Sequence, residues 1–290
     1  PGGSSSGSAA AIAAGQIPLA IGTQTGGSVI RPASYCGVFG MKPSFGSISR
    51  AGVLQTSQTL DQVGVFASTL TGIGRLCDVI MTGAEGMMQA TQSACDNPRC
   101  LVFDGLYDGV VESGVQDAVS SVTASLGAAV THIPAPEMIA SYLAGHKAVY
   151  HVELAQNLGA ICDAKSALVG PAAKATVAIG RTHHSDVYDA AQGMRVRAIA
   201  ELSSYFTSYD VLITPAATSE APLFDDGTGN PTCNALWSFV GFPCITLPLA
   251  TGPTGLPVGV QLIGAMGADK KLLQIAKWLL DTYHDSRPAS

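Results

Sequence analysis

Apolar residues form two patterns along this chain: short continuous runs, and longer segments in which they lie three or four positions apart. Short apolar runs bounded by glycine, proline or polar residues are typical of buried strands. They predict strands at 19–22, 100–104, 129–133, 211–214, 244–247 and 258–263. Longer segments with apolar residues three or four positions apart predict helices. These helices are expected at 9–14, 68–81, 115–126, 137–164, 186–206 and 269–283, with Asp269 as the cap of the last one.

Strands that alternate with helices indicate an α/β fold in which helices flank a sheet. The sequence contains no internal repeat, and no linker divides it, so residues 1–290 are expected to form a single domain. Residues 85–205 carry most of the charge and predict a more peripheral layer.

The composition excludes several classes of protein. Hydrophobic residues make up 47% of the 290 residues, charged residues make up 12%, and the net charge is −6. This balance argues against a disordered chain, a coiled coil and a basic nucleic-acid-binding surface. The longest uncharged stretch, 227–268, is interrupted by five prolines. No apolar run of about 20 residues therefore predicts a membrane-spanning helix.

The cysteines and histidines argue against disulfides and metals. Seven scattered cysteines without a CxxC pair are typical of reduced thiols, which favours a cytoplasmic location. The six histidines form no HExxH motif and no cluster with carboxylates. We therefore expect no metal site and no cofactor.

The N-terminal segment 1–8, PGGSSSGS, has three interpretations from its residues alone. It resembles a flexible linker. The stretch 3–7 also fits GxSxG, the nucleophile elbow of α/β-hydrolases, with Ser5 as nucleophile and a histidine such as His284 as base. A phosphate-binding loop is the third interpretation, although the usual GK[ST] ending is missing.

A second glycine-rich segment, 23–28, follows a predicted strand. Gly26 and Gly27 would let backbone N–H groups approach a substrate oxygen closely, and Ser28 directly after them could act as a nucleophile. An ordinary tight turn is the alternative.

Together these segments and their surroundings resemble the amidase signature family. The matching strings are GGSSSGSAAAIAAG, IGTQTGGSVIRPASYCGVFGMKPSFGSISRAGV, TLDQVG, YDVLITP, GFP and GLPVGVQLIG. The resemblance spans the whole chain and is weakest between 85 and 205. It implies an α/β fold with a central mixed β-sheet covered by helices on both faces.

The resemblance also implies roles for individual residues. Ser28 would be the nucleophile, and Ser4 would be the cis-serine that bridges it to a lysine. The Gly3–Ser4 peptide bond is then expected to be cis, with the Ser4 hydroxyl within hydrogen-bond reach of the Ser28 hydroxyl. The oxyanion hole would be formed by the backbone of Thr25, Gly26, Gly27 and Ser28.

The sequence departs from the family pattern at three points. The family's lysine precedes the first glycine pair, and no lysine of this chain occupies that position; Lys42 matches a structural position instead. The resemblance thus implies a chain that begins at Pro1 without the N-terminal part carrying the lysine, and that turns over amides poorly by itself. Gln24 stands where the family often has Asp, and Arg31 lies one residue later than the usual Arg. These two changes favour a stand-alone amidase over a glutamyl-tRNA amidotransferase A-type subunit.

The favoured function is therefore hydrolysis of a carboxylic amide, or an ester, through a serine acyl-enzyme. The expected partner is a small amide substrate, with a homodimer as the assembly considered and neither nucleic acid nor membrane as a partner. Two alternatives stay open: a non-catalytic amidase-like binding protein and an amidotransferase A-type subunit. Asn234, Trp237 and Phe239 are candidates for the border of the substrate pocket or for the core.

Overall fold

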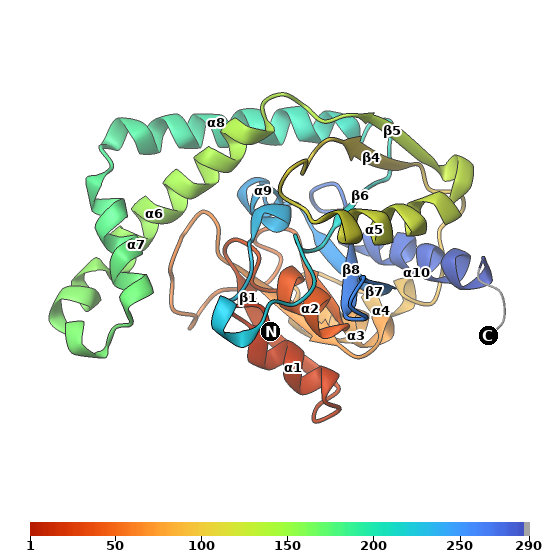
Figure 1. The fold of residues 1–290 in the computed structure, drawn as a ribbon, viewed down its shortest axis with the longest axis horizontal. Coiled ribbons are helices and arrows are strands. Elements are labelled where there is room, and N and C mark those ends of the chain that lie inside the picture. Colours follow the sequence, from red (N-terminus) through yellow and green to blue (C-terminus); the bar gives the residue numbers. More distant parts are fainter. Residues whose placement is uncertain (287–290) are drawn as a thin grey trace.

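A mixed sheet of eight strands runs through the centre of the molecule, and helices cover both of its faces (Figure 1). The computed structural model describes residues 1–286. The strands lie side by side in the order β1-β3-β2-β7-β8-β6-β4-β5. Their bounds are β1 (Leu19–Gln24), β2 (Phe39–Lys42), β3 (Gln62–Ala67), β4 (Cys100–Asp104), β5 (Val130–Pro134), β6 (Val211–Pro215), β7 (Cys244–Thr251) and β8 (Pro257–Ile263).

The sheet is mixed because β4 pairs in parallel with both β5 and β6, whereas all other neighbours are antiparallel. A helix, α5 (Ser113–Ser125), connects β4 to β5, as a parallel crossover requires. These observations confirm the predicted fold class.

Alternating side chains of each strand divide the core between the two faces. In β6, Val211 and Ile213 pack in the cluster that contains α3 (Leu70–Ile80), α5 and α10 (Asp269–Asp285). Leu212 points to the opposite face and packs with residues of α9 (Thr232–Val240).

The remaining helices are α1 (Ser6–Ala13), α2 (Ile30–Cys36), α4 (Met87–Ala90), α6 (Ile139–Ala164), α7 (Pro171–Thr182) and α8 (Ser185–Tyr205), with short 3₁₀ turns at Gly127–Ala129, Ser166–Leu168 and Phe224–Asp226.

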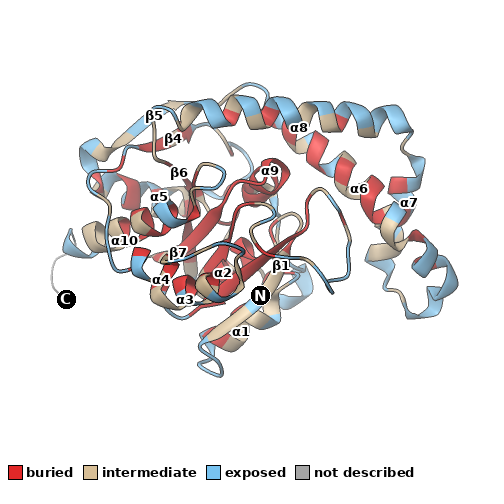
Figure 2. Ribbon diagram, turned by 180° about the vertical axis from the view of Figure 1, so that it is seen from behind, coloured by how far each residue is buried: buried red, intermediate tan, exposed pale blue. Residues whose placement is uncertain are grey.

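Helices α6, α7 and α8 form an arm: its inner part packs against α9, and its outer part projects from the rest of the molecule (Figure 1). Much of its surface is exposed (Figure 2), and its outer part is held by a small apolar cluster of Leu154, Cys162 and Val177. This arm belongs to the segment that the charge distribution predicts as peripheral. Among residues 1–286, no helix combines the length and apolar character needed to span a bilayer.

The sequence did not predict several elements, among them β2, β3 and α9. One predicted helix cap, Asp269, is also wrong. The strands β2 and β3 are short and contain glycine, and α9 is buried on all sides, so its sequence shows no helical periodicity. Asp269 does not cap α10: its carboxylate accepts hydrogen bonds from the backbone N–H of Ser44 at 2.8 Å and from the Ser44 hydroxyl at 2.6 Å. The carboxylate therefore joins α10 to the loop after β2.

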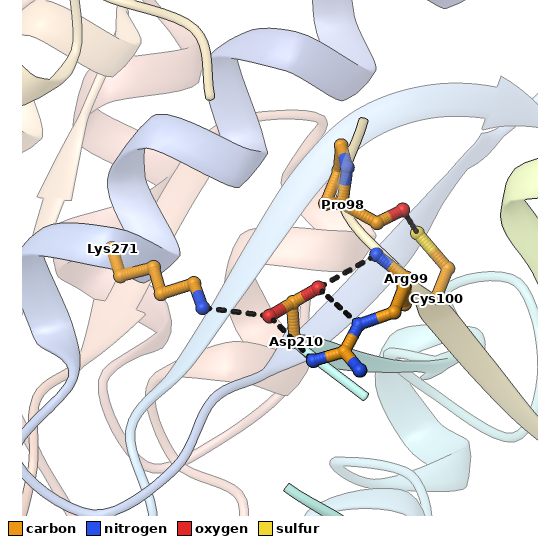
Figure 3. A network of polar contacts seen from close by, with 5 residues as sticks. All are labelled: Pro98, Arg99, Cys100, Asp210 and Lys271. Carbon is orange, nitrogen blue, oxygen red and sulfur yellow. Dashed lines mark hydrogen bonds and ion pairs between the residues drawn. The ribbon is translucent and has the colours of Figure 1, made fainter. Parts of the chain in front are cut away.

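Asp210, just before β6, joins three elements at one edge of the core (Figure 3). Its carboxylate accepts hydrogen bonds from the Arg99 backbone N–H at 2.8 Å and from Lys271 Nζ at 2.7 Å. Burial alone would raise the pKa of Asp210, but the hydrogen bonds from Arg99 and Lys271 hold that pKa well below its usual value. The network fixes the start of β6 against the start of β4 and against α10.

We expect Asp210→Asn to lower the free energy of unfolding by about 1–2 kcal/mol at neutral pH, because Arg99 and Lys271 then lose the negative charge and one of the two acceptor oxygens that they bind. The folded pKa is depressed, so this contribution is present above the unfolded pKa of about 3.9 and is lost as the pH falls below it. Urea unfolding at neutral and acidic pH measures the difference. Asp163→Asn, which removes an exposed ion pair with Arg181, is the control and should change little. An effect of Asp210→Asn that grows toward low pH would contradict this account.

Candidate active site

The turn 25–28 joins β1 to α2, and three of its carbonyl groups are held by hydrogen bonds from different parts of the chain. The donors are His146 Nε2 to Thr25 O at 3.1 Å, Ser238 Oγ to Gly26 O at 2.7 Å and the Arg31 N–H to Gly27 O at 3.0 Å.

The N–H groups that follow these carbonyls are free. Within residues 1–286, the N–H groups of Gly26, Gly27 and Ser28 donate no hydrogen bond. In a trans peptide the C=O and the following N–H point in opposite directions. Each bonded carbonyl therefore fixes its own peptide, and the N–H of that peptide points away from the donor and is available to a ligand oxygen.

Gln24 fixes the start of α2, directly behind the turn. Its buried Oε1 accepts hydrogen bonds from the N–H groups of Val29 at 2.9 Å and Ile30 at 3.0 Å. Its Nε2 donates to Ser238 Oγ at 3.0 Å. The glutamine that departs from the family's usual Asp thus caps the helix and supports the residue that holds Gly26.

Asp61 holds the turn through the side chain of Thr25. The Thr25 hydroxyl donates to Asp61 Oδ1 at 2.6 Å. The same carboxylate accepts hydrogen bonds from the backbone N–H groups of Thr56 at 2.7 Å and Ser57 at 2.8 Å. One carboxylate therefore links the loop before β3 to the first residue of the turn.

Asn234 packs directly against Gly27. A Cβ atom at position 27 would lie 2.5 Å from Asn234 Oδ1, so only glycine fits. The Asn234 amide donates to Ala216 O at 3.0 Å and to Gln261 Oε1 at 3.2 Å. Of the three pocket candidates, Asn234 therefore contacts the turn, whereas Trp237 and Phe239 lie in the core.

The Gly3–Ser4 peptide bond is cis, as predicted. Arg31 Nη2 donates to Gly3 O at 2.7 Å, and Nη1 donates to Gly229 O. Arg31 is buried and forms no ion pair in the described part of the chain, and burial lowers its pKa. It connects the segment of Ser4 to the first turn of α2 and to the loop before α9.

The predicted hydrogen bond between the hydroxyls of Ser4 and Ser28 is not formed. Neither hydroxyl has a hydrogen-bond partner among residues 1–286. Ser4 is exposed and Ser28 is partly buried, so both hydroxyls remain available.

Ser5, the alternative nucleophile, is tied to β1. Its hydroxyl donates to Thr23 O and accepts from Thr23 N–H, both at 3.2 Å. The N-terminal segment also packs closely: a Cβ atom at Gly2 would lie 2.8 Å from Pro32 Cα. The segment is therefore part of the folded core of the site and not a free linker.

Lys42 has the structural role that the sequence indicates. It is fully buried, and Nζ donates to Gln62 Oε1 at 2.7 Å, to Pro43 O at 3.3 Å and to Phe242 O. These acceptors use all three N–H groups of an ammonium. Burial lowers the pKa of Lys42. It has no hydrogen bond to either candidate serine.

Sequence reasoning missed His146 and Ser238. Neither lies in a serine-glycine motif, and each reaches the turn from a helix more than a hundred residues away. Asp61 lies in the TLDQVG string, but its bond to Thr25 could not be inferred from that string.

Several known proteins are similar to this chain in sequence. A family model described as Amidase matches residues 1–103 and 110–273. The A-type subunit of the glutamyl-tRNA(Gln) amidotransferase of Symbiobacterium thermophilum is 32% identical over an alignment of 340 residues, which covers 100% of this chain and 68% of that protein. The corresponding protein of Synechococcus sp. strain CC9605 is 31% identical, with 95% of this chain and 65% of that protein covered.

Solved structures show the same similarity. A crystal structure of an amidase superposes with a TM-score of 0.85 at 25% identity, covering 95% of this chain and 65% of that chain. A chain from a vestigial protein complex that reveals the evolutionary origins of an s-triazine catabolic enzyme gives 0.86 at 27% identity and the same coverage. The chain spans about two thirds of the length of these relatives. It belongs to the amidase signature family.

Proposed function

We propose that this chain supplies the nucleophile Ser28 and the oxyanion donors for hydrolysis of a small carboxylic amide through a covalent intermediate, together with the lysine base that the family resemblance implies. The observation that carries the proposal is the turn 25–28, where consecutive free N–H groups lie beside a serine with an available hydroxyl. Such a group of fixed donors stabilises the negative oxygen that develops when a hydroxyl attacks a carbonyl.

In the first step, Ser28 Oγ would attack the amide carbon, and the carbonyl electron pair would move onto the oxygen. The N–H groups of Gly26, Gly27 and Ser28 would stabilise this oxyanion. Ser4 would take the Ser28 proton and pass its own proton to the lysine that the family resemblance implies. That lysine must be neutral to act as a base, which a pocket poor in charge favours. The first 30 residues contain no charged side chain.

Collapse of the tetrahedral intermediate would break the C–N bond. The proton would return through Ser4 to the leaving nitrogen, and the amine or ammonia would depart. Water would then attack the acyl-enzyme, release the carboxylic acid and restore the Ser28 hydroxyl. The donors of the turn would serve both steps, because each passes through an oxyanion at the same place.

An amidotransferase A-type subunit is the second candidate, because curated relatives of that name are 31–32% identical. In that case the same chemistry would release ammonia for a partner protein. Gln24 and Arg31 differ from the family positions that we associate with such a subunit, and they favour the stand-alone amidase. Ammonia release by the purified protein without a partner distinguishes the two. The cytoplasmic location and the homodimer remain predictions.

Ser28→Ala should abolish hydrolysis in the native protein, whereas Ser5→Ala should retain most of it. Loss of a serine nucleophile typically costs about 10³-fold or more, while Ser5 supports only the backbone of β1. Release of 4-nitroaniline from 4-nitroacetanilide measures hydrolysis, and mass spectrometry after 4-nitrophenyl acetate detects the acylated serine. An inactive Ser5→Ala variant beside an active Ser28→Ala variant would favour the nucleophile elbow. A wild-type protein with neither turnover nor acylation would favour the non-catalytic binding protein.

Gly27→Ala should reduce activity strongly and lower the free energy of unfolding by about 1–3 kcal/mol, because the new methyl group overlaps the Asn234 amide. Gly7→Ala is the matched control: it lies in α1 with open space around it, and alanine favours a helix. Thermal unfolding and hydrolysis are measured for both variants. If the two behaved alike, close packing of the turn against Asn234 would not be required.

A further inference from the structure

A histidine from the arm reaches the turn that carries the proposed oxyanion donors. His146 lies on α6, and its Nε2 is 3.1 Å from the carbonyl oxygen of Thr25. The side chain is 6% exposed, and its ring packs edge-on against Phe239 with the ring centroids 6.2 Å apart. The ring atom Cε1 would lie 3.7 Å from a Cβ atom at Gly26, so imidazole and turn are in close contact.

The direction of this hydrogen bond fixes the protonation of the ring. A carbonyl oxygen can only accept, so Nε2 carries the proton and donates it. Burial lowers the pKa of His146 to about 4, although the bond to Thr25 acts in the opposite direction. The ring is therefore neutral at neutral pH, and it acts as a donor without changing its charge.

The hydrogen bond from His146 to the Thr25 carbonyl also fixes the direction of the Gly26 N–H, because both groups belong to one planar peptide. Its C=O faces His146, and its N–H therefore faces the opposite way, where it donates no hydrogen bond within the described residues. Rotation of this peptide plane would turn the Gly26 N–H away from a substrate oxygen and would break the hydrogen bond to His146. The imidazole thus opposes the motion that would disable this donor.

Helix α6 also supports the turn indirectly, through the loop before β3. Glu153, seven residues further on and about two helical turns away, lies on the same face of α6. Its buried carboxylate accepts hydrogen bonds from the Ser57 hydroxyl and from the Thr59 N–H at 3.0 Å. That loop also carries Asp61, which binds the Thr25 hydroxyl. Thr25 is thereby held from two sides by elements anchored to one helix.

We propose that His146 is a positioning residue of the oxyanion turn, which holds the Thr25–Gly26 peptide so that the Gly26 N–H points at the reacting carbonyl oxygen. The inference rests on the proposed function and adds a residue that lies outside the serine-glycine motifs. The imidazole transfers no proton in the reaction; it acts through the backbone that it fixes.

The test compares His146→Phe, which keeps a ring without a donor, with His146→Gln, which keeps a donor. Steady-state hydrolysis of 4-nitroacetanilide is measured on the native protein, at a temperature where circular dichroism shows each variant folded. We expect the phenylalanine variant to lose about 10–100-fold in kcat with KM nearly unchanged, somewhat less than the loss of an oxyanion donor itself. Glutamine should restore most of this loss. His151→Phe, on the same helix but without contact to the turn, is the control and should retain normal kcat.

The pH profile separates positioning from proton transfer. With His146 neutral throughout, the phenylalanine variant should show a lower profile of unchanged shape. Loss of an inflection between pH 5 and 8 would make His146 a proton carrier and overturn the proposal. Equal kcat in His146→Phe and the wild type, with Ser28→Ala inactive, would overturn the role of His146 alone. Absence of Ser28-dependent turnover in the wild type would overturn the proposed function together with this inference.

Discussion

The site depends on the fixed relation between the two polar groups of a peptide bond. At the turn 25–28, the C=O group of three consecutive peptides is bonded and, in the described part of the chain, the N–H group of the same peptides is unpaired. The carbonyl bonds oppose rotation of these peptides, so the N–H groups keep their direction. An isolated glycine-rich turn would lack this rigidity, since glycine restricts the backbone least. The surrounding fold therefore supplies His146, Ser238 and the first turn of α2 as external supports. Asn234 packs against Gly27 so closely that no side chain fits there.

Two basic side chains near this site are buried without a carboxylate partner among the described residues. Arg31 and Lys42 are both buried, and both donate to neutral oxygens instead of carboxylates. A buried cation without an ion pair is costly, and the hydrogen bonds to carbonyl groups offset part of that cost. Arg31 thereby orders the backbone on both sides of the proposed reaction centre, next to the Gly3 carbonyl and the helix that follows Ser28. Its positive charge agrees with a site where negative charge develops during reaction.

Much of the fold could be predicted because strands such as 100–104 are short apolar runs and because the amphipathic α10 shows a clear helical period. The helix α9 could not, because every residue from Cys233 to Val240 is buried and no polar face marks its period. For the site, the serine-glycine segments indicated the turn, and the resemblance to the amidase signature family implied the cis bond before Ser4. The hydrogen bonds of His146 and Ser238 could not be predicted, since no local pattern of residues indicates contacts across 121 and 212 positions of the chain.

These long separations also set the order in which the turn becomes complete during synthesis. Thr25 and Ser28 leave the ribosome early, but α6 follows more than a hundred residues later and Ser238 later still. Until α9 has emerged and packed, the Gly26 carbonyl has no donor and Gln24 has no Ser238 to support. Until then the glycine-rich segment lacks these supports, and glycine restricts its backbone least. Under the proposed function, Ser28 therefore gains fixed oxyanion donors only after α9 has been made and has packed against the turn.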